Sequence, residues 1–247
     1  MSDNPITLAV LDMAGTTVAD GGSVLAAFDA AAAAAGLPTD GPGHDEVRQY
    51  VVDTMGQSKI TVFRHLVDGD EARAQAANAA FEKAYDAQIA DGGATPIDGA
   101  AQSISQLRDS GIKVALTTGF SANTQKLLID SLGWHDLADL VIAPSDTLRG
   151  RPFPDMILSA LITLRIDDVR QVAVVGDTAN DITSGVRAGA GIVAGVLTGA
   201  HDEDTLRAAG ATDVVADIGA AAALFLSLIH ISEPTRRLRG SRMPSSA

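Results

Sequence analysis

The stretch Ile6-Thr7-Leu8-Ala9-Val10-Leu11-Asp12-Met13-Ala14-Gly15-Thr16-Thr17 decides the fold. A short apolar run ends abruptly in an aspartate and is followed by small and hydroxyl-bearing residues. This pattern is typical of a buried strand with a functional loop at its carboxyl end. We therefore expect a strand over residues 6–11 and a ligand-facing carboxylate at Asp12.

Downstream of Pro96 the pattern alternates between helical and strand-like segments. The expected helices are 100–110, 122–132, 155–164 and 181–188, and the expected strands are 113–117, 140–143, 171–175, 191–196 and 213–215. Repeated β-α order with short connections predicts an α/β fold, with a parallel sheet covered by helices on both faces.

The segment from Ser23 to about Ala90 has helical periodicity and no strand pattern. The expected helices are 25–35, 46–54, 59–67 and 71–89, with a polar link over 39–44. Because the first strand precedes this segment, the sequence predicts a discontinuous core of residues 1–19 and 95–225. An all-helical cap over 20–94 is inserted in it.

Residues 226–247 differ in character from the rest of the chain. Four arginines and a single acidic residue fall there, and residues 227–236 resemble translated adaptor or vector sequence. The alternative is a disordered basic tail. In both cases we expect residues 226–247 to have no part in the function.

Composition restricts the class of partner. The net charge of −13 disfavours nonspecific binding to nucleic acid or to anionic membranes. An anionic substrate would therefore need local positive charge, which a metal ion and a few cationic side chains could supply. There is no cysteine, no basic-then-apolar start, and no apolar run of about 18–20 residues. We expect a cytoplasmic protein without membrane attachment.

Four predicted strands are followed by loops with polar signatures. The loops are Asp12-Met13-Ala14-Gly15-Thr16-Thr17, Thr117-Thr118-Gly119, Gly150-Arg151-Pro152-Phe153-Pro154-Asp155 and Gly176-Asp177-Thr178-Ala179-Asn180-Asp181. Ligands of parallel sheets bind at the carboxyl ends of the strands, so these loops should meet. In this order and spacing they resemble the four motifs of the haloacid dehalogenase superfamily, over about residues 6–220.

The resemblance implies a Rossmann-like core, a phosphoryl substrate and Mg²⁺. Asp12 would attack phosphorus as an oxygen nucleophile. Asp12 and Asp177 would hold the metal with the backbone carbonyl of Ala14, and Asp181 would lie near the metal to orient it. The alternative for Asp181 is a helix N-cap.

Other residues of the same motifs would bind the phosphoryl group. Gly119 would belong to the substrate-binding residues, and Thr118 and the amides of Gly15 and Thr16 would donate hydrogen bonds to the phosphoryl oxygens. Arg151 would place positive charge beside the transition state. The alternative for Arg151 is a surface arginine ahead of a turn.

The residue at position 14 indicates which branch of the superfamily the sequence resembles most. Phosphatases of the superfamily carry an aspartate two residues after the nucleophile as a proton donor, and Ala14 cannot act in that way. Phosphonoacetaldehyde hydrolases share this alanine. The segment Met55-Gly56-Gln57-Ser58-Lys59-Ile60 is similar to their cap segment, in which a lysine forms a Schiff base. Lys59 would be that lysine and Met55 would line the closed site, unless Lys59 is a solvated helix lysine.

Two departures keep other activities open. Val62 stands where that family has a histidine, and its cap cysteine is absent; His65 could substitute, or be a partly buried helix histidine. The alternatives are a phosphatase for small phosphate esters without imine chemistry and a non-catalytic phosphometabolite-binding protein. The resemblance also suggests a homodimer formed through the cap helices.

Overall fold

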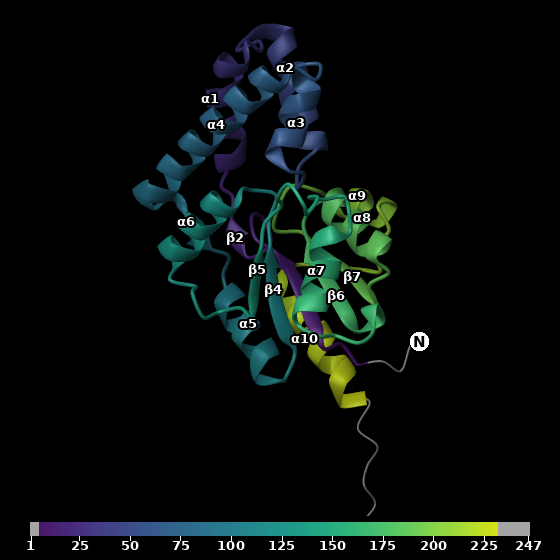
Figure 1. The fold of residues 1–247 in the computed structure, drawn as a ribbon. Coiled ribbons are helices and arrows are strands. Elements are labelled where there is room, and N and C mark those ends of the chain that lie inside the picture. Colours follow the sequence, from purple (N-terminus) through teal and green to yellow (C-terminus); the bar gives the residue numbers. More distant parts are fainter. Residues whose placement is uncertain (1–4, 232–247) are drawn as a thin grey trace, which may run out of the picture.

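A six-stranded parallel sheet organises the molecule (Figure 1), and it confirms the predicted α/β fold. The computed structural model describes residues 5–231. The strands are β1 Leu8–Asp12, β2 Val18–Ala19, β3 Thr95–Pro96, β4 Lys113–Thr117, β5 Leu140–Ile142, β6 Val172–Gly176, β7 Ile192–Val196 and β8 Asp213–Val215. The helices are α1 Ser23–Ala35, α2 Gly41–Asp53, α3 Lys59–Leu66, α4 Glu71–Gln88, α5 Ala100–Asp109, α6 Ala122–Leu132, α7 Asp155–Thr163, α8 Ala179–Ala188, α9 Glu203–Ala208 and α10 Ile218–Ile231.

The strand order β5-β4-β1-β6-β7-β8 places the first strand in the centre of the sheet. From β1 the chain adds β4 and β5 on one side and β6, β7 and β8 on the other. Strand order therefore reverses beside β1, which is where parallel sheets bind ligands. Asp12, the last residue of β1, lies at this point.

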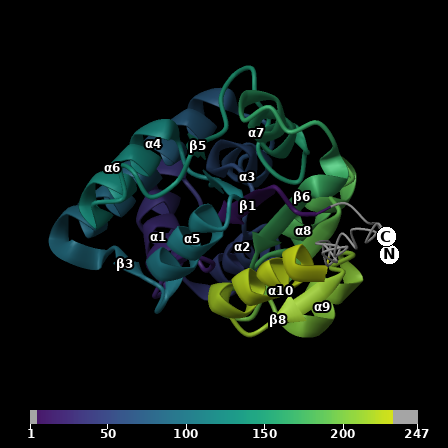
Figure 2. The same ribbon diagram turned by 90° about the horizontal axis from the view of Figure 1, so that it is seen from below.

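Both faces of the sheet are covered by helices. Alternate side chains of β1 enter different cores: Ala9 and Leu11 belong to the larger cluster, which includes Leu107 of α5 and Phe225 of α10. Leu8 and Val10 belong to a second cluster with residues of α7. This alternation follows from the two-residue period of a strand buried on both sides, and α5 and α10 lie together in the view from below (Figure 2).

Helices α1 to α4 form an inserted layer above the carboxyl edge of the sheet, and we call residues 23–88 the helical insert (Figure 1). Strands β2 and β3, which the sequence did not predict, pair antiparallel where the chain enters and leaves this layer. The predicted polar link over 39–44 is too long, since α2 already begins at Gly41. Proline at position 42 is compatible with a first helical turn, because the amide that it lacks would have no partner there.

At the other end, α10 continues to Ile231, past the predicted start of the tail at residue 226. The remainder of that tail, residues 232–247, lies outside the described residues. Across the part of the chain that the structure describes, no helix combines the length and the apolar character needed to cross a membrane.

Candidate active site

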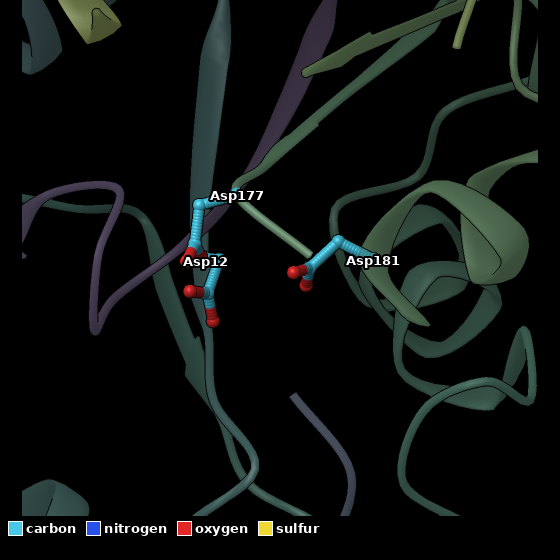
Figure 3. A group of neighbouring side chains, drawn as sticks. All are labelled: Asp12, Asp177 and Asp181. Carbon is cyan, nitrogen blue, oxygen red and sulfur yellow. The ribbon is translucent and has the colours of Figure 1, made fainter. Parts of the chain in front are cut away.

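Three buried carboxylates meet at the carboxyl edge of the sheet. Asp12 ends β1, Asp177 directly follows β6, and Asp181 lies in the first turn of α8 (Figure 3). One oxygen from each lies within 4.8 Å of the others, and all three side chains are buried. Asp12 is thus brought into one polar cluster with two aspartates that lie 165 or more positions away in the sequence.

Arg151, in the loop before α7, pairs with two of these carboxylates. Its Nη1 lies 2.6 Å from Oδ1 of Asp12 and its Nε lies 2.7 Å from Oδ1 of Asp181. Its Nη2 donates to Oγ1 of Thr117 at 2.6 Å. The guanidinium is buried, so it is a fixed charge inside the site and not a surface arginine.

The cluster holds more negative than positive charge. Burial raises the pKa of Asp12 well above its usual value, while Arg151 opposes that rise. Burial and the neighbouring Asp181 raise the pKa of Asp177 to about 6. Three carboxylates facing one guanidinium are the hard oxygen donors that Mg²⁺ prefers, so the donor set fits a divalent cation.

The loops after β1 and β7 hold the carboxylate of Asp177 in place. The amide of Ala200 donates to its Oδ2 at 2.7 Å, and the hydroxyl of Thr16 donates to its Oδ1 at 3.3 Å. Gly15 has a φ of +86°, and a Cβ there would lie 2.4 Å from Oδ2 of Asp177. A Cβ at Gly199 would lie 1.9 Å from the same oxygen. The sequence did not predict that the loop after β7 belongs to the site, because it contacts Asp177 through a backbone amide and a glycine and not through a charged side chain.

The predicted donors Gly15 and Thr16 require a correction. The amide of Gly15 donates to the carbonyl of Val18 at 2.8 Å, and that of Thr16 donates to the carbonyl of Met13 at 3.2 Å. Both amides therefore close the turn of their own loop and are not offered to a ligand. The buried side chain of Thr16 acts on Asp177 instead.

Asp181 combines a local role with a place in the cluster. Thr178, and not Asp181, is the N-cap of α8: its hydroxyl accepts from the amide of Asp181 at 3.2 Å. In return, Oδ2 of Asp181 accepts from the amide of Thr178 at 3.1 Å, which makes a capping box. The other oxygen of Asp181 faces Arg151.

A cavity of about 380 Å³ lies between this cluster and the helical insert. The predicted site residues in its wall are Asp12, Ala14, Gly15, Met55, Lys59, Thr118, Gly119, Arg151 and Asp177. Thr16 and Asp181 do not line it and lie behind the wall. The hydroxyl of Thr118 accepts from the amide of Phe120 at 3.2 Å, which leaves its proton available to a ligand.

Lys59, the first residue of α3, is buried in the cavity wall. Its Nζ lies 5.2, 5.7 and 5.8 Å from the ring centroids of Phe120, Phe28 and Phe81. Burial lowers the pKa of Lys59 to about 8, although Asp20 and Asp12 act in the opposite direction. The amine is thus available without its proton far more often than a solvated lysine. The three phenylalanines come from α1, α4 and the loop after β4.

The structure shows where His65, Val62 and His201 lie relative to the site. His65 is exposed and stacks on Tyr50, with ring centroids 4.3 Å apart, so it is neither partly buried nor at the site. Val62 is buried in the core. His201 directly follows Ala200, which lines the cavity. Its Nδ1 accepts a hydrogen bond from the amide of Ala179 at 2.9 Å.

The loop that precedes Lys59 docks directly on the core. The side chain of Asn180 donates to the carbonyl of Met55 at 2.7 Å. A Cβ at Gly119 would lie 2.7 Å from the carbonyl oxygen of Gln57, and one at Gly56, whose φ is +85°, would lie 2.4 Å from Oγ1 of Thr178. The sequence indicated Asn180 only as part of the loop 176–181 and did not predict its hydrogen bond to Met55.

Gly119→Ala is expected to displace the helical insert, because the new methyl group would meet the backbone of Gln57 and Gly56. Limited proteolysis of residues 54–58 should become several-fold faster, while the melting temperature of the core changes little. Gly219→Ala is the matched control, since its Cβ would meet nothing nearer than 3.2 Å. Unchanged proteolysis in Gly119→Ala would contradict the close docking.

A sequence model of the haloacid dehalogenase-like hydrolase family matches residues 6–189. The chain belongs to this family. A phosphonoacetaldehyde hydrolase of Parabacteroides distasonis is 37% identical over 125 residues, which cover 49% of this chain and 46% of the relative. One from Bacillus cereus is 33% identical over 110 residues, 44% of this chain and 41% of the relative. The match thus spans less than half the length of these curated relatives.

Solved structures of the family share the fold. A phosphonoacetaldehyde hydrolase-like protein from Oleispira antarctica superposes with a TM-score of 0.78 at 21% identity, over 98% of this chain and 97% of that one. A hydrolase from Pseudomonas syringae gives a TM-score of 0.77 at 21% identity, over 92% and 100%. At these identities the two superpositions show that the fold is shared.

Proposed function

We propose that this hydrolase cleaves the carbon–phosphorus bond of phosphonoacetaldehyde or a related small phosphonate. Residues 1–19 and 95–225 serve as its catalytic core, and residues 20–94 serve as a cap. The observation that carries the proposal is the buried amine of Lys59, which lines the same cavity as the carboxylate of Asp12. An ester phosphatase needs no such amine, whereas carbon–phosphorus cleavage needs a place for the carbon's electron pair.

In the proposed reaction Lys59 condenses with the aldehyde and releases water, which forms a protonated imine. An oxygen of Asp12 then bonds to phosphorus as the carbon–phosphorus bond breaks. The electron pair of that bond moves toward the iminium nitrogen, so the carbon leaves as an enamine. Water releases phosphate from Asp12, and protonation and hydrolysis of the enamine return acetaldehyde and the free amine.

Arg151 and Thr118 bind the phosphoryl group in this proposal. The guanidinium is held by Asp12 and Asp181, so its charge is in place before the substrate arrives. The hydroxyl of Thr118 donates to a phosphoryl oxygen. Gly119 allows Gln57 to approach the core and so brings Lys59 over the site.

Mg²⁺ fits the carboxylate cluster described above. Asp12 and Asp177 would hold it with the carbonyl of Ala14, and Asp181 would lie close by, oriented by Thr178. When bound, the ion would offset the negative charge that Asp12 and a phosphonate bring together.

Removal of Mg²⁺ with EDTA is expected to abolish turnover, and its return should restore it. Because the ion binds only the folded protein, a concentration of about 100 times Kd should stabilise the fold by about 2.7 kcal/mol. A thermal melt with and without Mg²⁺ measures this effect. Asp177→Asn should lose the Mg²⁺-dependent rise, and a rise that persists in this variant would place the metal elsewhere.

The rate of imine formation should depend on pH through Lys59. With a pKa of about 8, about a tenth of the amine is neutral at pH 7, against fewer than about one in a thousand for an ordinary lysine. Below pH 8 the rate should rise about tenfold per pH unit, and above it the rate should level off. A rate that keeps rising to pH 10 would show that the amine is solvated.

Borohydride trapping tests the proposal directly. Incubation of the enzyme with phosphonoacetaldehyde and borohydride should give an adduct that mass spectrometry locates at Lys59. Lys59→Arg keeps the positive charge but cannot form the imine, so it should lose both adduct and phosphate release. Full turnover in Lys59→Arg would eliminate the imine mechanism. Hydrolysis of acetyl phosphate that does not depend on Lys59 would instead favour a phosphatase for small phosphate esters. Absence of turnover and phosphoenzyme across the panel would favour a binding protein.

A further inference from the structure

One carboxylate in the cavity wall has no place in the scheme above. Among residues 5–231, the titratable side chains that line the cavity are Asp12, Asp20, Lys59, Arg151 and Asp177. Asp12 and Asp177 face the phosphoryl end, and a guanidinium does not release its proton. Asp20 is left, beside the insert end of the cavity.

Asp20 is held in a defined orientation between β2 and α1. Its Oδ2 accepts from the amide of Gly22 at 3.2 Å, and its Oδ1 accepts from the amide of Val24 at 3.1 Å. Asp20 is half-buried and lines the cavity, and its carboxylate can accept further hydrogen bonds beyond those from the two backbone amides.

Asp20 also lies within electrostatic reach of the reactive amine. Among the carboxylates, it has the largest effect on the pKa of Lys59, ahead of Asp12. Asp20 likewise contributes to raising the pKa of the buried Tyr85 hydroxyl, again ahead of Asp12. Asp20 therefore interacts electrostatically with both Lys59 and Tyr85, and Asp12 acts on the same two groups more weakly.

Imine formation requires a group that takes and returns protons. Starting from the ammonium, two protons must leave nitrogen and end on the departing water. General acid–base help in such transfers is worth about 10²–10⁴-fold. The described residues of the cavity wall include no histidine, cysteine or tyrosine that could give it.

We propose that Asp20 carries these protons between Lys59 and the carbonyl oxygen of the substrate. The inference rests on the proposed function, since it assigns a catalytic residue to the imine step. Asp20 first takes a proton from the ammonium, and the free amine bonds to the carbonyl carbon. The protonated Asp20 then returns that proton to the oxygen. It takes a second proton from nitrogen and delivers it to the hydroxyl as the carbon–oxygen bond breaks, so that water leaves and a protonated imine remains.

Trapping with acetaldehyde and borohydride isolates this step from phosphorus chemistry. Wild type should form the Lys59 adduct, and Asp20→Asn should form it at least about 100-fold more slowly. Asparagine retains an oxygen acceptor for the amide of Val24, so the start of α1 should persist, and circular dichroism and a thermal melt check this. Asp86→Asn is the matched control, because Asp86 of α4 also accepts two hydrogen bonds, from Asn123 and Thr124, away from the cavity wall.

Chemical rescue separates proton transfer from a structural role. Formate should restore adduct formation in Asp20→Ala, because a small carboxylate can enter the space left by the side chain, and it should leave Asp86→Ala unaffected. An Asp20→Asn variant as fast as wild type, or an Asp20→Ala variant that formate does not rescue, would overturn the role of Asp20 alone. No adduct at Lys59 in wild type would overturn both this inference and the proposed function.

Discussion

Replacing Lys59 with methionine is expected to abolish carbon–phosphorus cleavage and, at the same time, to stabilise the protein. Methionine fills much of the same space among Phe28, Phe81 and Phe120, but it has no amine to form an imine. Phosphate release from phosphonoacetaldehyde should fall by about 10⁴-fold or more, as it does when a covalent catalytic group is removed from other enzymes.

The gain in stability follows from the lowered pKa of Lys59. An unfolded lysine has a pKa near 10.4 and the folded one about 8, so the native state is penalised whenever the amine carries its proton. The penalty is fully present below pH 8, shrinks as the pH rises from 8 to 10.4, and is absent above that range. At pH 7 Lys59→Met should therefore stabilise the fold by about 1–3 kcal/mol.

Denaturant unfolding of wild type and Lys59→Met at pH 7 and pH 10 measures both the gain and its loss at high pH. Lys83→Met is the control, because Lys83 is an exposed lysine of α4. Its substitution should change neither turnover nor stability by a comparable amount. A Lys59→Met enzyme that is destabilised at pH 7 would mean that the amine is hydrated in solution.

Asp12→Asn should remove the nucleophile and leave the site assembled. The amide oxygen can still accept from Arg151, and Asp181 still pairs with the guanidinium. Turnover should fall by about 10⁴-fold or more, and no phosphoenzyme should be detected by acid quench and mass spectrometry. Since the substitution also removes one of three crowded buried carboxylates, we expect no loss of thermal stability.

Thr117→Val serves as the comparison, because Thr117 touches Arg151 but does not line the cavity. It should keep the phosphoenzyme and lose only part of the rate. An Asp12→Asn enzyme that retains more than about a hundredth of wild-type turnover would show that water, and not this carboxylate, attacks phosphorus. Lys59 adduct formation with acetaldehyde should persist in Asp12→Asn, since imine chemistry does not need the nucleophile.

Local patterns were sufficient for most of the architecture. The strands at 113–117 and 213–215 and the helix at 122–132 match the structure without change, because their periodicity and flanking glycines are strong local signals. The β2–β3 pair and α10 were not predicted. Two-residue strands exist only by pairing across 75 or more residues. Helix α10 begins at Ile218 in the predicted core and runs past residue 226, into the segment whose composition looked foreign.

The sequence by itself determined the class of fold and the identity of the groups at the sheet edge. Parallel strands end at the same edge of the sheet, so the polar loops that follow several of them lie close together however the helical insert packs. Only the tertiary structure decided what surrounds those groups. The phenyl rings at Lys59, the supports of Asp177 from Thr16 and Ala200, and the cavity that Asp20 and Lys59 share all join segments distant in the chain. Reactivity here depends on burial and neighbouring charge, and both are properties of the packed chain that no local pattern encodes.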